Sequence, residues 1–211
     1  MLEAGAVRAI NVKNILLKNL LDACVTAVFY FFCGYAFQYG GGGGGNGDGG
    51  DEETATLATT FIGRTGFFLK GLTRASDYSN YFLSYGFAAS SVTIVACAVA
   101  ERCQFMAYIF YSILLSGFVY PVVARSMWTE YGFLSSAASD PFLGVGVVDF
   151  AGSGVVHLTG GATAFIACRL LGPRIGRFYD LQGEPLEKPV EFKPHSSALQ
   201  VLGTMLLWFG W

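Results

Sequence analysis

The sequence predicts an all-α protein whose helices form a polytopic transmembrane bundle. Hydrophobic residues make up 53% of the 211-residue chain and charged residues only 13%, whereas a soluble domain carries about 25% charged residues. Residues 78–100 and residues 103–124 contain no charged side chain, and each stretch is longer than the roughly 20 residues that a helix needs to cross a bilayer. We therefore expect a multi-pass protein embedded in a lipid bilayer.

Three more apolar stretches complete the expected bundle. The first covers about residues 14–39, another covers about residues 147–171, and the last begins near His195 and is still apolar at Trp211. Each is long enough, or close to long enough, to cross the hydrocarbon core as a helix. The sequence thus predicts five helical segments joined by polar connections.

The connections differ in basic charge, and this difference predicts the orientation. Cytoplasmic connections carry the excess of Lys and Arg. One set of connections contains Arg8, Lys13, Lys18, Arg102, Arg169, Arg174, Arg177, Lys188 and Lys193. The other set contains Arg64, Lys70, Arg74 and Arg125. The richer set should be cytoplasmic, which leaves residues 40–76 and 126–146 outside.

A glycine run opens the first of these outer connections. Between residues 40 and 50 only Asn46 and Asp48 are not glycine. Such a composition cannot bury apolar surface, so residues 40–60 should form a flexible extracellular tether. A phosphate-binding glycine loop is excluded because no Lys-Ser/Thr follows the run and no strand precedes it.

Composition also excludes several function classes. The formal net charge is −2, and no cluster of Lys and Arg resembles a nucleic-acid-binding patch. The five cysteines form no CxxC pair and have no histidine at metal-ligand spacing, so they should be small buried hydrophobic residues and not part of a disulfide framework or a zinc site. We expect no metal, no cofactor, no nucleic-acid partner and no enzymatic activity.

Few ionisable residues lie within the expected helices. Asp22 follows Lys18 by four residues, a spacing that predicts a local ion pair near the cytoplasmic end. His195 follows Pro194 at an expected helix start, where a capping or solvated role is typical.

The most informative segment is DFAGSGVVHLTGGATAFIACRLLGPR, residues 149–174. His157 comes eight residues after Asp149, which places it about 12 Å deeper along a helix and about 80° around its axis. Asp149 suits a helix N-cap. His157 is either a core histidine bonded to another helix or a pore-lining imidazole able to relay a proton near neutral pH. The surrounding small residues would let neighbouring helices approach closely.

Sequence motifs in this segment and elsewhere resemble those of the ammonium transporter/Rh family, with the plant and algal type the most similar. They are MLEAGAVRAINVKNILLKNLLDA at the start, FAASSVTIVACAVAER at 87–102, GFVYPVV at 117–123, DFAGSGVVHLTGG at 149–161 and PHSSALQVLGTMLLWFGW at the end. The DFAG(x)4HLTGG pattern is highly specific, and the motifs occur in the family's order.

This resemblance implies a partial ammonium-transporter fold, with about five to six of the family's eleven helices, starting at the end of the first and stopping within the sixth. It implies a homotrimer in the plasma membrane with an ammonium/ammonia pore in each subunit. By motif, His157 falls on the first of two pore histidines, Asp149 on the acidic residue below the outer recruitment site, and Phe87 on one of two stacked gate phenylalanines.

One motif departs from the family. The outer-vestibule tryptophan of the family lies in a DGW-like motif, and this chain reads EYGF, so Phe133 should take its place and weaken cation–π recruitment. Trp128 matches a different family tryptophan. Two functions follow: transport with His157 relaying the proton, or a degenerate, non-conducting relative that acts as a sensor or assembly partner.

Overall fold

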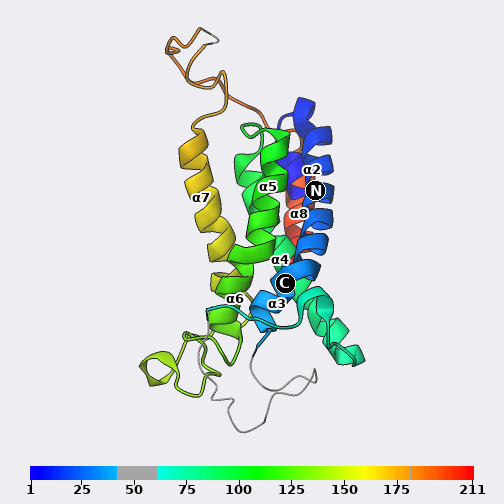
Figure 1. Cartoon of the computed structure of the whole chain (residues 1–211). Helices are drawn as coiled ribbons and strands as arrows, with labels where there is room; N and C mark the ends of the chain where they lie inside the picture. The colour runs from blue at the N-terminus through cyan, green and yellow to red at the C-terminus, as the bar shows by residue number, and fades with distance from the viewer. Residues whose placement is uncertain (42–60, 181) are drawn as a thin grey trace.

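A computed structural model describes residues 1–41, 61–180 and 182–211 (Figure 1). The expected all-α class is confirmed, because the described residues form helices and contain only two isolated β-bridges, Ser135 to Val147 and Tyr179 to Pro185. Apart from Gly40 and Gly41, the predicted glycine tether lies outside the described residues.

The first long segment is interrupted by a π-helical turn. A short helix, α1 (Leu2–Ala6), precedes it. The segment then runs through η1 (Ala9–Asn11), α2 (Val12–Phe29), η2 (Tyr30–Gly34) and α3 (Tyr35–Tyr39), and η2 is the π-helical part. It covers the expected span at 14–39 and starts earlier.

The remaining expected spans are also present. They are α4 (Ala75–Val99); α5 (Phe105–Leu114), η4 (Leu115–Val119) and α6 (Tyr120–Trp128); η6 (Ser153–Leu158) and α7 (Thr159–Leu171); and α8 (Ser197–Gly210). Within the described ranges, four segments are long and apolar enough to cross a membrane, while α8 is shorter. Short 3-10 turns occur at η3 (Phe67–Leu69) and η5 (Phe142–Gly144).

Helix α4 lies at the centre of the bundle. It packs against α7 on one side and α2 on another, while α5 packs against α2. Toward one end, Val92 and Val95 of α4 contact Tyr108 and Ala164 in a buried core. Toward the other end, Ala88 joins a second core whose buried residues are Tyr30, Tyr120, Ala124, Val155 and Val156. Figure 1 shows these helices lying side by side, and the two cores pack between them.

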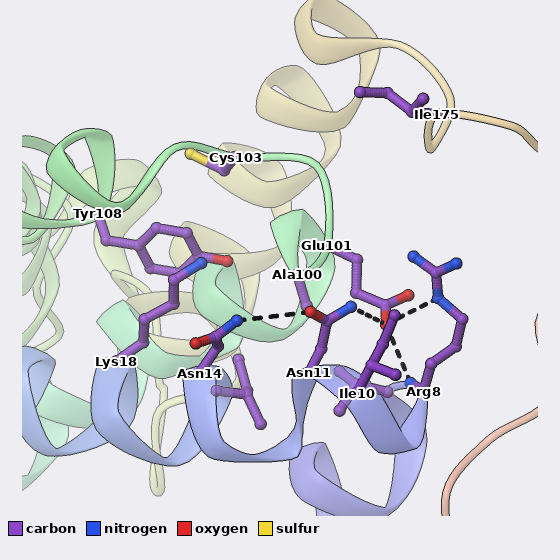
Figure 2. A pocket seen from close by; sticks show the side chains of 12 residues that line it. Arg8, Ile10, Asn11, Asn14, Lys18, Ala100, Glu101, Cys103, Tyr108 and Ile175 are labelled. Carbon is purple, nitrogen blue, oxygen red and sulfur yellow. Dashed lines mark hydrogen bonds and ion pairs between the residues drawn. The ribbon is translucent and has the colours of Figure 1, made fainter. Parts of the chain in front are cut away.

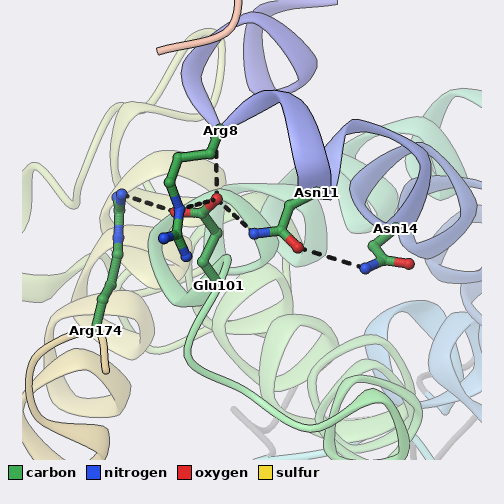
Figure 3. A network of polar contacts seen from close by, with 5 residues as sticks. All are labelled: Arg8, Asn11, Asn14, Glu101 and Arg174. Carbon is green, nitrogen blue, oxygen red and sulfur yellow. Dashed lines mark hydrogen bonds and ion pairs between the residues drawn. The ribbon is translucent and has the colours of Figure 1, made fainter. Parts of the chain in front are cut away.

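A buried carboxylate ties three connections together at one end of the bundle (Figure 3). Glu101 Oε1 accepts hydrogen bonds from the backbone N–H of Arg8 (3.0 Å), from Arg8 Nε (3.2 Å) and from Asn11 Nδ2 (2.7 Å), and Oε2 accepts one from Arg174 Nη1 (3.0 Å). Burial raises the pKa of Glu101, but the bonds from Asn11 and Arg8 outweigh it and hold the pKa below the ordinary value. Residues 8–11, 101 and 174 therefore meet at this end.

A buried arginine closes the opposite end. Arg125 is fully buried, and its guanidinium donates to the carbonyl oxygens of Gln38 (2.9 Å), Gly40 (3.0 Å) and Gly41 (3.1 Å). These carbonyls lie where α3 ends and have no helical partner of their own. The two basic sets predicted from the sequence thus lie at opposite ends, and the assignment of the richer end to the cytoplasm stays a prediction.

Two details of the sequence-based expectation were wrong. The expected helix at 147–171 begins at Ser153, because Gly152 adopts φ +90° and Asp149 holds the residues between them in a turn. The expected pair of Lys18 and Asp22 does not form. Asp22 accepts hydrogen bonds from Ser112 and Tyr111 on α5, and the Lys18 ammonium lies 3.8 Å from the centre of the Tyr108 ring.

We predict that Glu101→Gln lowers the free energy of unfolding by roughly 1–3 kcal/mol at neutral pH, since the amide leaves buried donors without a full complement of acceptors. Denaturant unfolding followed by tryptophan fluorescence would measure it, with the exposed Glu191→Gln as the matched control. A folded-state pKa below the unfolded value means that the carboxylate stabilises the fold at pH values above the unfolded pKa. This contribution is lost as the pH falls through the folded-state pKa. Equal free energies of unfolding for Glu101→Gln and Glu191→Gln at pH 7 would show that the hydrogen bonds of Glu101 contribute no stability.

Candidate functional site

A row of aromatic rings runs from the end of α6 to the histidine at the start of the η6–α7 helix. The ring of Trp128 lies 5.2 Å from that of Phe87, centre to centre, and Phe87 lies 5.7 Å from Trp211. Trp211 in turn contacts His157 edge to face at 4.7 Å. Four segments contribute one ring each, namely α6, α4, the end of α8, and η6. The row is therefore a product of the tertiary fold, because no two of its members are neighbours in sequence.

Asp149 organises the backbone beside this row. Its Oδ1 accepts the N–H groups of Gly152 and Ser153 (2.8 Å each), and its Oδ2 accepts those of Gly154 (2.9 Å) and Val155 (2.8 Å). These are the first amide groups of the helix, which have no intrahelical acceptor. Although burial raises the pKa of Asp149, the four backbone hydrogen bonds lower it below the ordinary value. The carboxylate is therefore ionised at neutral pH and fully engaged with the chain.

The backbone oxygen of Asp149 links this cap to the aromatic row. Trp128 Nε1 donates a hydrogen bond of 2.6 Å to it. The indole N–H is thereby satisfied, which a partly buried tryptophan requires, and the indole plane is fixed against Phe87. Gly152 contributes to the same fit, because a Cβ there would lie 2.6 Å from Val156 Cγ2 and the backbone is left-handed.

His157 lies in a π-helical turn, η6, and not in regular α-helix. Turns of this kind widen the helix locally and occur often at functional sites. The Nδ1 atom lies 3.1 Å from the carbonyl oxygen of Gly152. Since a carbonyl oxygen only accepts, Nδ1 must carry the proton in the neutral ring, which leaves the lone pair on Nε2. Nε2 has no hydrogen-bond partner among the described residues, so it is free to accept a proton or a hydrogen bond.

The structure brings together three of the four residues singled out from the sequence. Phe87 and His157 are members of the row, and Asp149 supports it from beside Trp128. Phe133 is 57% exposed, and its ring has no aromatic contact within the described part of the chain. The vestibule role expected for Phe133 stays a prediction, and the structure does not bring it to the site.

From the sequence, Trp128 was considered but not assigned to the site, and Trp211 was noted only as the point where the chain stops. Trp128 ends a membrane span, where tryptophan is common for interfacial reasons alone, so its position gave no reason to single it out. The signal that was available is that Trp128 and Asp149 stand at the two ends of the same connection, the one between α6 and η6.

The site contains no metal-binding arrangement. Nowhere in residues 1–41, 61–180 and 182–211 do three His, Cys, Asp or Glu side chains gather closely enough to hold a metal ion. All five cysteines are free, but the prediction that they are buried was wrong, because Cys24 is exposed and the others are only partly buried.

Comparison with known proteins gives consistent matches along the whole chain. The sequence model of the Ammonium Transporter Family matches residues 1–211. Ammonium transporter 1 member 1 of rice (Oryza sativa subsp. japonica) is 45% identical over 214 residues, which cover 100% of this chain and 39% of the rice protein. Ammonium transporter 1 member 3 of tomato (Solanum lycopersicum) is 42% identical, covering 100% of this chain and 42% of the tomato protein. The chain thus spans about two fifths of these relatives.

A solved structure matches the fold at comparable coverage. The structure titled "Sensor Amt Protein" superposes with a TM-score of 0.76 at 30% identity, and the match covers 100% of this chain and 47% of that one.

We predict that Asp149→Asn destabilises the start of the η6–α7 helix. The asparagine side chain would present an NH2 group to backbone N–H groups that donate to a carboxylate oxygen in the unsubstituted protein. The expected loss is roughly 1–3 kcal/mol in the free energy of unfolding, with faster amide hydrogen exchange at Gly154 and Val155. Asp140→Asn is the control, since Asp140 is exposed in the same connection between α6 and η6. Unchanged exchange at both amides in Asp149→Asn would contradict the capping role.

Proposed function

Because the chain belongs to the ammonium transporter family, we propose that its aromatic row and His157 form part of a pathway that moves ammonium across a membrane. The ammonium ion is collected at the outer end, gives up its proton, and passes onward as ammonia while the proton is carried separately. The single observation that supports this most strongly is the unbroken series of contacts from Asp149 through Trp128, Phe87 and Trp211 to His157.

Collection of the cation is assigned to the outer end of the row. An aromatic face attracts a cation through its quadrupole, and tryptophan attracts it more strongly than phenylalanine. Trp128 is only partly buried, and its ring is held in place by the bond to Asp149. The Asp149 carboxylate does not bind the ion, because four amide groups already occupy it. It contributes a negative field and a fixed backbone.

Passage beyond the rings requires loss of the proton. An ammonium ion enclosed by apolar rings loses its hydration without gaining comparable partners, which is costly for any isolated charge. Neutral ammonia avoids most of that cost. The packed rings of Phe87, Trp128 and Trp211 thus favour the neutral species and exclude larger hydrated ions.

His157 is the proposed proton acceptor on this path. Its Nε2 lone pair is free within the described chain, so the imidazole can accept a proton from a passing substrate. A neutral imidazole is also tolerated at membrane depth more readily than a carboxylate or an ammonium group. The hydrogen bond from Nδ1 to Gly152 fixes the ring so that Nε2 faces away from its own helix turn.

We place this activity in a homotrimer at the plasma membrane, as the family resemblance implies. The exposed apolar residues of α2, α4 and α8, among them Leu20, Phe82 and Phe209, support an environment of lipid or neighbouring helices. Blue native electrophoresis of the detergent-solubilised protein would test the trimer.

Sensing without conduction is the second candidate. The observation that favours it is the similarity to the structure titled "Sensor Amt Protein". In that reading the row still binds ammonium, but no net flux follows. Binding without uptake would distinguish it from transport.

We predict that His157→Ala abolishes ammonium uptake or uncouples it from charge movement while the protein remains folded. The test replaces the matched segment of the rice relative with these 211 residues and measures uptake and current in yeast that lacks its own ammonium transporters. His195→Ala is the matched control, since His195 is exposed at the opposite end of the bundle from Asp149. Normal uptake and current in His157→Ala, together with a lowered melting temperature, would leave His157 with a structural role only.

We also predict different outcomes for two aromatic substitutions in the same chimaera. Trp128→Leu removes the partly buried ring that contacts Phe87, so KM for ammonium should rise by about tenfold, which corresponds to ~1.4 kcal/mol of cation–π stabilisation. Phe133→Leu should change KM by less than about twofold. The reverse order of effects would return the recruitment role to Phe133.

A further inference from the structure

A cavity of about 360 Å³ lies between the first turns of α2 and the turn that joins α4 to α5 (Figure 2). One wall consists of four polar residues from η1, α2 and the residue before them: Arg8, Asn11, Asn14 and Lys18. In Figure 2 these side chains stand in a row on one side of the chain and face the turn that carries Glu101. The spacing of three and four residues from Asn11 to Lys18 puts these side chains on one face of the helix.

This row contains hydrogen-bond donors that the protein leaves unused. Arg8 donates through its backbone N–H and Nε to Glu101, and neither of its Nη atoms donates to a described residue. The Lys18 ammonium lies over the Tyr108 ring at 3.8 Å, and no carboxylate in the described ranges forms an ion pair with it. Both residues line the cavity and carry N–H groups without a described protein acceptor, although the Arg8 guanidinium also lies 4.1 Å from the centre of the Phe192 ring.

The two carboxylates beside the cavity, Glu101 and Asp22, already accept hydrogen bonds. Both oxygens of Glu101 are bonded, and the carboxylate is balanced by two guanidinium groups, those of Arg8 and Arg174. Asp22, one turn beyond Lys18, accepts from Ser112 and Tyr111 and faces α5. The cavity therefore has an excess of positive charge and free donors, which is the complement of an anion.

The surroundings indicate which anion fits. Ile10 and Ile175 line the cavity and are 77% and 80% exposed, so apolar side chains border a basic site. Farther along α2, Leu16 and Leu17 are each 50% exposed and continue the apolar surface into the span. A phospholipid matches both features, because its phosphate accepts charge-assisted hydrogen bonds while its acyl chains cover apolar side chains.

We propose that this cavity binds the phosphate group of an anionic phospholipid, with Lys18, Arg8 and Asn14 as the donors. The site lies at the end of the bundle that carries most of the Lys and Arg residues, which the charge distribution predicts to be cytoplasmic, and anionic lipids are available in the cytoplasmic leaflet. A free phosphate ion offers the same oxygen atoms, but it lacks the chains that would cover Ile10 and the leucines of α2. The sequence did not reveal this site, because its basic residues are ten positions apart and Glu101 comes from a distant turn.

The test measures binding to the full chain, purified in a neutral detergent, through its melting temperature and through native mass spectrometry. The probes are dioctanoyl phosphatidylglycerol, dioctanoyl phosphatidylcholine and inorganic phosphate. We expect phosphatidylglycerol to raise the melting temperature and to bind at least tenfold more tightly than either other probe. Lys18→Gln should weaken that binding about tenfold, and Lys13→Gln should not, because Lys13 is exposed and does not line the cavity.

A second variant guards against a folding defect in Lys18→Gln. Asn14 is exposed, so Asn14→Asp preserves shape and places a carboxylate in the cavity, which should weaken phosphatidylglycerol binding at an unchanged melting temperature of the lipid-free protein. Equal effects of Lys13→Gln and Lys18→Gln would overturn the proposal in favour of unspecific surface charge. Inorganic phosphate binding as tightly as phosphatidylglycerol would overturn the assignment to a lipid.

Discussion

The helix that carries His157 begins within the bundle, and its first amide groups need acceptors that lipid does not supply. Asp149 meets this requirement with one carboxylate that accepts four backbone N–H groups. The same turn places the Asp149 carbonyl oxygen where Trp128 donates to it. The position of the aromatic row, and with it the position of His157 relative to the row, depends on this cap.

Polar groups elsewhere in the bundle follow the same constraint. Glu101 joins three connections at one end and Arg125 satisfies three carbonyl oxygens at the other, and both side chains are almost entirely buried. Each is satisfied by partners from distant parts of the chain, as buried charges must be. The π-helical turns at η2, η4 and η6 are also tolerated because neighbouring helices pack against them. The bundle is thus held by cores of apolar side chains and by charges at the two ends.

Much of the fold could be predicted from the sequence, because a helix that crosses a bilayer needs a stretch of about 20 residues with few or no charged side chains. The spans at 78–100 and 103–124 needed no further information. The start of the helix at Ser153 was missed by six residues, since an apolar composition does not show that Asp149 folds back on the following amides. The pairing of Lys18 with Asp22 failed because side chains of α5 offered Asp22 nearer donors. The rule that side chains four residues apart interact on a helix considers that helix alone and takes no account of donors on a neighbouring helix.

The site was predictable in part. Motifs pointed to Asp149, His157 and Phe87, whereas the contact of Trp128 with Phe87 depends on how α4 and α6 pack, which no local pattern encodes. The same limit applied to the basic cavity beside α2. Its donors are left for a ligand because both oxygens of Glu101 already accept hydrogen bonds from other groups, and no local sequence pattern shows this.

The protonation of His157 tests the account most directly. The chain has only two histidines, so nitrogen-15 labelling of histidine gives few signals, and His195→Gln assigns them. We predict that the His157 ring carries a proton on Nδ1, and that its Nε2 resonance shifts when ammonium is added while that of His195 stays in place. A proton on Nε2, or an Nε2 resonance indifferent to ammonium, would contradict it.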